Sequence, residues 1–401
     1  MHRSISFVAG LLFAASLLAN LPAQLPAQPA STLETLVRGN EQFGRKLLLE
    51  TQQENPNRNV VVAPLPLTLT MAALTTDSHV DNLQMQSEIE DLFGWERYPD
   101  ISAASGMLRE VFSPPHVANP KTGEHPTPAP YASYAWIQNT LLYQPDSSGK
   151  NPFSQYFLQN GERYFGLNSQ RIPRDSSQGS GPGKGPLRAS FRSEMHVHMV
   201  WEGNTFSMSK PYQADFQSAS GRTESVEMQD SELNNYLYTK TDTYEAAVLP
   251  CYTGTMTVIL PLEGKTTQDV ERVLAAGPDG TGSELSKRIG IVRMPSFHFR
   301  VHYAMKPTFE AMGIHEIFLS LGDIADLPTR VTDISEAIDI AVDKNGIRAD
   351  ADAVTGMVLA GIMSAPEPFY LKLNRPFIFL IREKNTGALM LAGAVTDPAE
   401  Q

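Results

Sequence analysis

Two pairs of histidines lie in expected strands, and one pair has the spacing that a shared metal ion would need. His196 and His198 stand two residues apart in one expected strand, and His298 and His302 lie in another. Side chains two residues apart project from the same face of a strand, where two imidazoles can bind one metal ion. Because no cysteine or cluster of carboxylates accompanies either pair, we interpret them as ordinary strand histidines and predict no metal site.

Other segments that could carry chemistry lack a complete motif. Cys251 is the only cysteine and follows an apolar strand pattern over 246–249, so we interpret it as a buried small hydrophobic residue. The glycine-rich segment 181–185 lacks the Ser or Thr and the helix that a phosphate-binding loop needs, which favours a flexible linker. Neither a Gly-x-Ser-x-Gly elbow nor a His-Glu-x-x-His motif occurs. We therefore predict that the chain is not an enzyme and uses no cofactor.

The segment after Gly346 alternates between apolar and charged residues. The odd-numbered positions are Ile347, Ala349, Ala351 and Ala353, and the even-numbered positions are Arg348, Asp350 and Asp352. This period of two predicts a strand with one buried face and one solvent-exposed face, on which the aspartates are solubilising charges and not a catalytic pair. Glycines and prolines over 356–368 then indicate a loop. A strand pattern within a loop predicts two conformations for the same residues, with Gly346 as the hinge.

The first residues of the chain predict export. A short basic start, His2 and Arg3, precedes an apolar run over 5–19, and Leu21-Pro22-Ala23 follows it. This pattern is typical of a secretory signal peptide over 1–23, because the apolar run is too short to favour a membrane span; an uncleaved anchor is the alternative. Residues 24–31 form a Pro/Ala/Gln-rich spacer, and 32–398 are expected to form a single domain. We therefore expect a secreted, extracellular protein.

Composition limits the partners of the chain. Hydrophobic residues make up 41% of the sequence, which is enough for a substantial core. The formal net charge is −12. An acidic protein of this kind repels polyanions, so we expect no nucleic acid, no heparin-like polyanion and no anionic membrane among its partners.

Hydrophobic periodicity predicts a mixture of helices and strands. Helices are expected over 32–52, 83–93, 101–112, 152–165 and 267–275, and a further helix is entered through 60–66 and continues to Ala73. Strands are expected over 133–143, 191–201, 236–249, 256–262 and 333–343. Two continuous apolar runs, 377–381 and 389–395, flank Asn385-Thr386-Gly387 and predict an antiparallel hairpin that is buried on both faces.

This C-terminal segment resembles the signature of the serpin family. Asn374-Arg375-Pro376-Phe377 leads into the hairpin, Gly393 closes it, and Asp397-Pro398 ends it. The resemblance covers about Thr32 to Pro398 and is strongest after Thr257. It implies an α+β fold with three β-sheets, about eight helices and an exposed reactive-centre loop over about 346–368.

The resemblance also implies a function, the suicide inhibition of a protease. The target protease would cut the loop and form a covalent acyl-enzyme with it, and the hinge residues Gly346, Ile347, Ala349, Ala351 and Ala353 would then insert into the main sheet. The family's usual hinge length places the cut at Ala360–Gly361, and Leu359 and Met363 (before Ser364) are alternatives. These side chains are apolar, which favours serine or cysteine proteases of elastase-, chymotrypsin- or subtilisin-like specificity over trypsin-like ones.

Several residues depart from the family's pattern. Between Asn168 and Phe191, where the family carries a helix across its main sheet or the approach to it, the glycines and prolines exclude a long helix. Lys344 stands where inhibitors usually have Glu, Glu336 stands near a customary His, and Arg348, Asp350 and Asp352 replace an acidic residue and two small ones. The alternative expectation is therefore a non-inhibitory serpin that acts as a binding, carrier or signalling protein.

Overall fold

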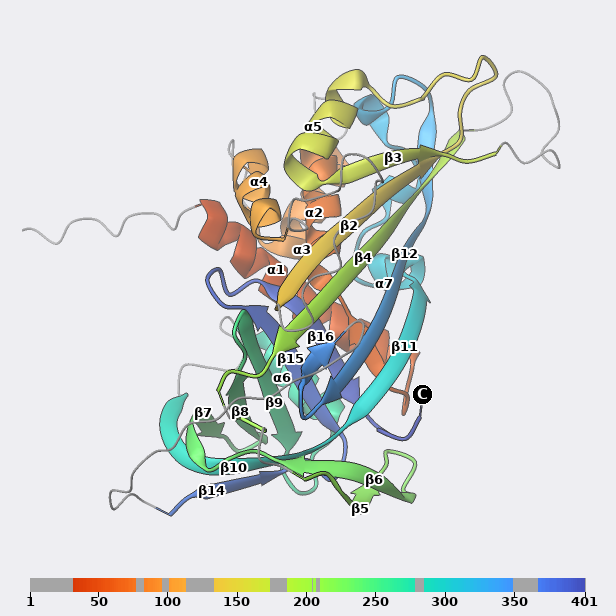
Figure 1. Cartoon of the computed structure of the whole chain (residues 1–401). Helices are drawn as coiled ribbons and strands as arrows, with labels where there is room; N and C mark the ends of the chain where they lie inside the picture. The colour runs from red at the N-terminus through yellow and green to blue at the C-terminus, as the bar shows by residue number, and fades with distance from the viewer. Residues whose placement is uncertain are drawn as a thin grey trace, which may run out of the picture. The chain divides into compact units, whose positions relative to one another are not determined.

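The computed structural model describes residues 32–76, 83–95, 101–112, 133–173, 186–203, 205–206, 210–277, 285–348 and 367–400. The predicted signal peptide and spacer lie outside these ranges. Residues from Thr32 onward form one compact unit (Figure 1). Its α-helices are α1 (Thr32–Glu54), α2 (Pro64–Thr75), α3 (Leu83–Phe93), α4 (Ile101–Val111), α5 (Gln155–Phe165), α6 (Thr267–Ala276) and α7 (Lys306–Ala311). A mixed α+β architecture, as the sequence predicts, is therefore confirmed.

One of the two sheets has six strands in the order β11-β12-β13-β4-β2-β3. These strands are β2 (Tyr134–Tyr143), β3 (Leu167–Arg171), β4 (Leu187–Val200), β11 (Phe297–Ala304), β12 (Thr329–Asp343) and β13 (Gly346–Arg348). Helix α2 packs against β2 and β4 on one face. In Figure 1 the opposite face is turned to the viewer, and no labelled helix crosses in front of β2, β4 and β12.

The other sheet has ten strands, and its main path runs β1-β16-β15-β9-β8-β7-β10-β6-β5, with β14 paired to β10. The strands are β1 (Val60–Val62), β5 (Tyr212–Gln217), β6 (Thr223–Asp230), β7 (Asn234–Lys240), β8 (Tyr244–Pro250), β9 (Gly254–Pro261), β10 (Ser286–Pro295), β14 (Phe369–Lys372), β15 (Phe377–Glu383) and β16 (Leu389–Val395). Three separate sheets were expected. They join into two here because β10 is long enough to pair with β7 along one half and with β6 and β14 along the other.

The expected strand over 236–249 is wrong, since two strands occupy that stretch. Thr241 Oγ1 accepts hydrogen bonds from the N–H groups of Thr243 and Tyr244 at 3.1 and 3.0 Å, which turns the chain between β7 and β8. A hydroxyl that bonds to the backbone two residues on stabilises a turn of this kind. The run of threonine and aspartate over 241–243 was the sequence signal for it.

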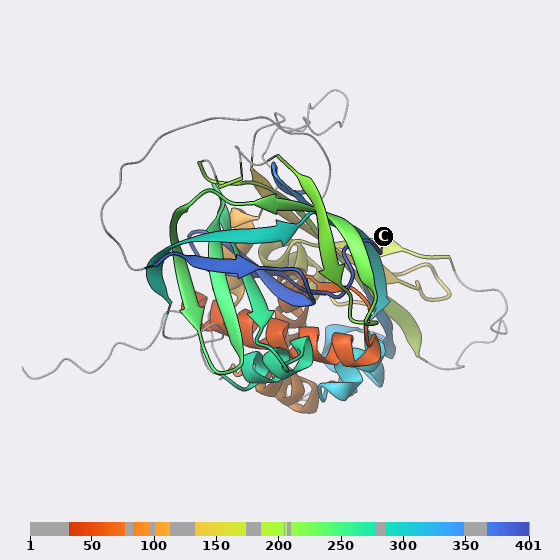
Figure 2. The ribbon, with the colours of Figure 1, turned by 90° about the horizontal axis from the view of Figure 1, so that it is seen from below.

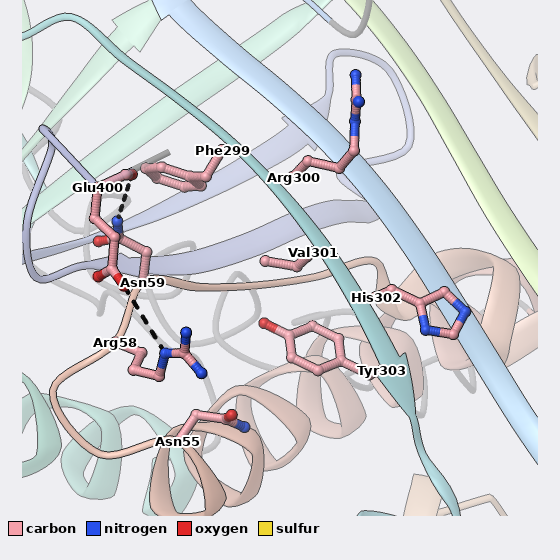
Figure 3. A pocket seen from close by; sticks show the side chains of 9 residues that line it. All are labelled: Asn55, Arg58, Asn59, Phe299, Arg300, Val301, His302, Tyr303 and Glu400. Atoms are coloured by element: carbon pink, nitrogen blue, oxygen red, sulfur yellow. Dashed lines mark hydrogen bonds and ion pairs between the residues drawn. The ribbon is translucent and has the colours of Figure 1, made fainter.

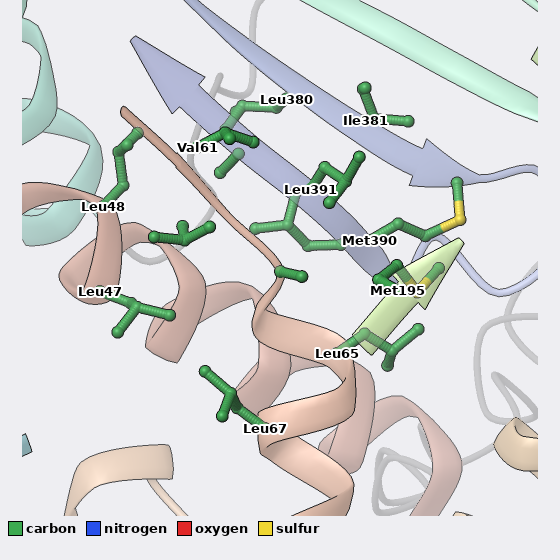
Figure 4. Close-up of a cluster of buried hydrophobic side chains, with 14 of the residues drawn as sticks. Leu47, Leu48, Val61, Leu65, Leu67, Met195, Leu380, Ile381, Met390 and Leu391 are labelled. Carbon is green, nitrogen blue, oxygen red and sulfur yellow. The ribbon is translucent and has the colours of Figure 1, made fainter. Parts of the chain in front are cut away.

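The main core lies between α1, α2 and the β15–β16 hairpin (Figure 4). Side chains from α1 and α2 contact strands that come from the other end of the sequence; those labelled include Leu47, Leu48, Leu65, Leu67, Met195, Leu380, Ile381, Met390 and Leu391. Every residue of β16 is buried, as are the first five of β15. The predicted hairpin with two buried faces is therefore confirmed.

Candidate functional site

The predicted hinge begins inside the six-stranded sheet. Strand β12 ends at Asp343, the chain turns, and β13 runs back antiparallel to β12 with Ile347 opposite Val342. On its other edge β13 pairs antiparallel with β4, and Ile347 lies opposite Met199. The Ile347 side chain is fully buried. The first three residues of a stretch that was expected to be an exposed loop are thus ordered between two strands.

The turn between β12 and β13 requires a glycine at position 346. Its φ of 153° is in a region that favours glycine, and a Cβ built on it would lie 2.2 Å from the carbonyl oxygen of Met199. The turn is also held by side chains. Asn345 N–H donates to Asp343 Oδ1 at 2.7 Å, and the Trp201 indole N–H donates to the Asp343 carbonyl oxygen at 2.8 Å.

Beyond β13 the same two strands pair directly with each other. Residues Thr329–Ala337 of β12 run parallel to Leu187–Glu194 of β4. The sheet therefore has a fork: β12 and β4 are in contact along one half and are separated by β13 at the other end. A longer inserted strand can be accommodated only if this parallel pairing opens.

A buried carboxyl group lies on the closed half of this fork. Glu336 is fully buried on β12, opposite Ser193 of β4 and Tyr303 of β11. Neither carboxylate oxygen makes a hydrogen bond of normal geometry among the described residues. Burial raises the pKa of Glu336 to about 8, and the nearby N–H of Ala63 offsets this only in part. Glu336 occupies one of the alternate positions of β12 that are otherwise apolar, and this was a sequence signal for its burial.

Ion pairs cover the open face of the sheet. Asp339 of β12 accepts from His298 Nε2 at 2.7 Å and also pairs with Arg300. Burial alone would raise the pKa of Asp339, but these two partners outweigh it and lower the pKa. On β4, Glu194 lies 2.8 Å from Arg192 and 3.6 Å from His196.

The strand histidines have separate environments. The His196 ring is stacked on Trp136 at 3.8 Å, and His198 is buried. His298 and His302 lie on β11, the edge strand. No group of three or more potential metal ligands occurs in the part of the chain that the structure describes. Cys251 is fully buried, and burial raises the pKa of its thiol far above the usual range.

A hollow of about 250 Å³ lies along the outer edge of β11 (Figure 3). In this view Phe299, Val301 and Tyr303 point toward the hollow, while Arg300 and His302 point away from it. Arg58 borders it and is 3.9 Å from Glu400. The hollow therefore has an apolar wall on the strand side and an ion pair at its rim.

Most of the predicted loop residues lie outside the described residues. This applies to the remaining hinge positions Ala349, Ala351 and Ala353, and to Leu359, Ala360, Gly361, Met363 and Ser364 at the predicted cut. The chain is described again from Glu367, shortly before β14. Among described helices, none is long and apolar enough to cross a membrane.

Comparisons of sequence and structure agree on the family. Iripin-2 of Ixodes ricinus is 28% identical over 145 residues. This match covers 35% of this chain and only 36% of Iripin-2. A serine protease inhibitor of Rattus norvegicus is 22% identical over 386 residues, 91% of this chain and 89% of that one.

The fold also matches solved structures. Human thyroxine-binding globulin superposes with a TM-score of 0.72 at 16% identity, covering 92% of this chain and 100% of that one. Tengpin, a thermophilic serpin in its native state, superposes with a TM-score of 0.69 at 18% identity, covering 90% of this chain and 94% of that one. The family model described as Serpin (serine protease inhibitor) matches residues 191–398, more than half of the sequence. The chain belongs to the serpin family.

Proposed function

We propose that this serpin is secreted and inhibits serine or cysteine proteases of elastase-, chymotrypsin- or subtilisin-like specificity. The protease cuts the loop at Ala360–Gly361 and forms an ester or thioester with the Ala360 carbonyl carbon. The freed hinge strand then inserts between β12 and β4 and carries the acyl-enzyme with it before water can hydrolyse the bond. Members of this family are generally protease inhibitors and not catalysts, which agrees with this role.

The length of the slot is the observation that carries the proposal. Gly346 lies opposite Val200, the last residue of β4, and the next residues follow in steps of one along the strand. Continuing this register would bring Leu359 opposite Leu187, the first residue of β4. The slot is therefore filled when Leu359 has inserted, and Ala360 is the first residue beyond it. This supports the cut after Ala360 independently of the family's usual hinge length.

The strand directions give insertion a driving force. Strands β12 and β4 are parallel to each other, while β13 is antiparallel to both. Full insertion would replace one parallel ladder by two antiparallel ones, which are slightly more stable per residue and add main-chain hydrogen bonds. The uncut loop cannot release its far end, so a kinetic barrier holds the chain in the less stable state.

Incubation with an elastase-, a chymotrypsin- and a subtilisin-like protease, followed by a denaturing gel, tests this proposal. The expected result is a band that resists SDS, at the summed mass of protease and serpin less the fragment released from Gly361 onward. Mass spectrometry of the small C-terminal fragment should then give Gly361 as its first residue. Loop cleavage without any such band for every protease would refute inhibition.

A non-inhibitory role as a binding or carrier protein is the second candidate. The match to thyroxine-binding globulin, solved in complex with thyroxine, favours it. Asp350 also supports it, because the continued register would bring Asp350 opposite Asp339 of β12, and like charges that face each other across strands are destabilising. On this alternative the gel shows the cut chain only.

A further inference from the structure

Large apolar side chains are exposed on both sides of strand β10. Tyr370 of β14 is 71% exposed, and Leu233, just before β7, is 57% exposed. Tyr370 is in register with Ile291 of β10. Leu233 precedes Asn234, which pairs with Gly290, and Gly290 also pairs with Phe369 of β14. Because one residue pairs with both strands, β7 and β14 occupy opposite edges of β10, and the two exposed side chains flank Ile291.

A cationic row borders this apolar row. Lys372 of β14 is exposed and lies in register with Arg293 of β10. Arg293 donates to both carboxylate oxygens of Asp230 at 2.7 Å and lies over the Tyr212 ring at 5.5 Å. Lys372 also acts electrostatically on Asp230, so two cations flank this one carboxylate.

We propose that Tyr370, Ile291, Leu233 and Lys372, here called the β10–β14 face, form a second contact surface for the target protease. The inference rests on the proposed function and adds to it a contact outside the loop. The surface that it fits is an apolar spot bordered by acidic side chains, close to the substrate cleft of the protease. Exposed apolar patches with a polar border are typical of protein contact sites.

The length of the loop argues for this occupant. Tyr370 is the tenth residue after Ala360, and a fully extended chain of this length spans at most about 35 Å. A protease domain of ordinary size is about 45 Å across. A protease bound at Ala360 is therefore held within one protein diameter of Tyr370. Figure 2 looks from below onto the end of the molecule that carries β10 and β14.

Association rates of surface variants test the inference. Tyr370→Ala removes the most exposed side chain of the apolar row, and Lys372→Glu reverses the cationic charge. Tyr156→Ala is the matched control, because Tyr156 is 58% exposed and α5, which carries it, lies at the opposite end of the view in Figure 1. The second-order rate constant for loop cleavage or complex formation is measured for each protein, and thermal melting confirms that the variants are folded.

We expect Tyr370→Ala and Lys372→Glu each to lower the rate constant about five-fold or more, as loss of an energetically important contact residue does. The control should react at the rate of the unchanged protein, and only the Lys372 contribution should weaken as salt rises. Equal rates for all four proteins, or an equal loss in all three variants, would overturn the β10–β14 face while leaving inhibition intact. If no protease attacks the loop, the proposed function itself is wrong, and the proposed contact surface is refuted as well.

Discussion

Ile347 of β13 and Met199 of β4 lie in register, and both side chains are fully buried. This pair sets the parity of every residue that would follow into the slot. Positions at even spacing from Ile347, which include Ala349, Ala351 and Ala353, would face the core, and Asp350 and Asp352 would face solvent. The register also sets the number of residues that the slot can take.

Loop cleavage should stabilise the protein. A single cut near Ala360 frees the strand to insert, and each new main-chain hydrogen bond contributes about 1 kcal/mol. A gain of several kcal/mol should raise the melting temperature by about 5 °C for a domain of this size. Calorimetry before and after the cut measures it. An unchanged or lower melting temperature would show that no strand is added.

The two faces of the hinge should respond differently to substitution. Ala351→Arg would bury an unpaired charge in the closed sheet at a cost of several kcal/mol, so cleaved protein should no longer gain stability. Asp350→Asn, the solvent-facing neighbour, removes a like charge from beside Asp339 and should preserve or increase that gain. Melting of the cut variants distinguishes the two. Similar effects at both positions would mean that the parity is wrong.

The residue before the cut should determine which protease is captured. Ala360→Arg should shift reactivity from elastase-like to trypsin-like enzymes, because the buried acid of a trypsin-like pocket then gains a partner. The same exchange at Leu359 or Met363 should have little effect on trypsin capture. Denaturing gels with both enzymes are the measurement. Trypsin capture by Met363→Arg, and not by Ala360→Arg, would move the cut toward Ser364.

Stability should fall as the pH rises from about 4.5 to about 8. The Glu336 carboxyl has a pKa of about 8 in the folded chain and an ordinary value of 4.5 when exposed. Between these values the unfolded chain releases the proton while the folded chain retains it, so folding is progressively disfavoured. Burial likewise raises the pKa of Glu271 on α6 to about 8.

Glu336→Gln should therefore flatten the pH dependence by up to a few kcal/mol across that window. Glu271→Gln is the matched variant, and it should flatten the pH dependence of stability over the same pH range. Of the two residues, only Glu336 belongs to the strand that borders the slot. Urea unfolding at pH 5, 6, 7 and 8 gives the slopes. A slope for Glu336→Gln equal to that of the unchanged protein would contradict the raised pKa of this buried carboxyl.

Sequence patterns determined the elements whose burial is uniform. The β15–β16 hairpin could be predicted because both of its faces are buried, so its residues are apolar throughout. Side-chain periodicity records burial directly, so the hairpin needed no knowledge of its neighbours. The Ala/Asp alternation predicts a strand with two unlike faces, and beyond Arg348 this stays a prediction.

Only the tertiary structure decided which strands meet. Local periodicity carries no information on pairing partners, so the register of Gly346 with Val200, and with it the capacity of the slot, could not be predicted from the sequence. The same holds for the merging of the expected three sheets through β10. Glu336 is the clearest case. Its place among the alternate apolar positions of β12 indicated burial, but the absence of a normal hydrogen bond to it among the described residues depends on what surrounds it, which no local pattern contains.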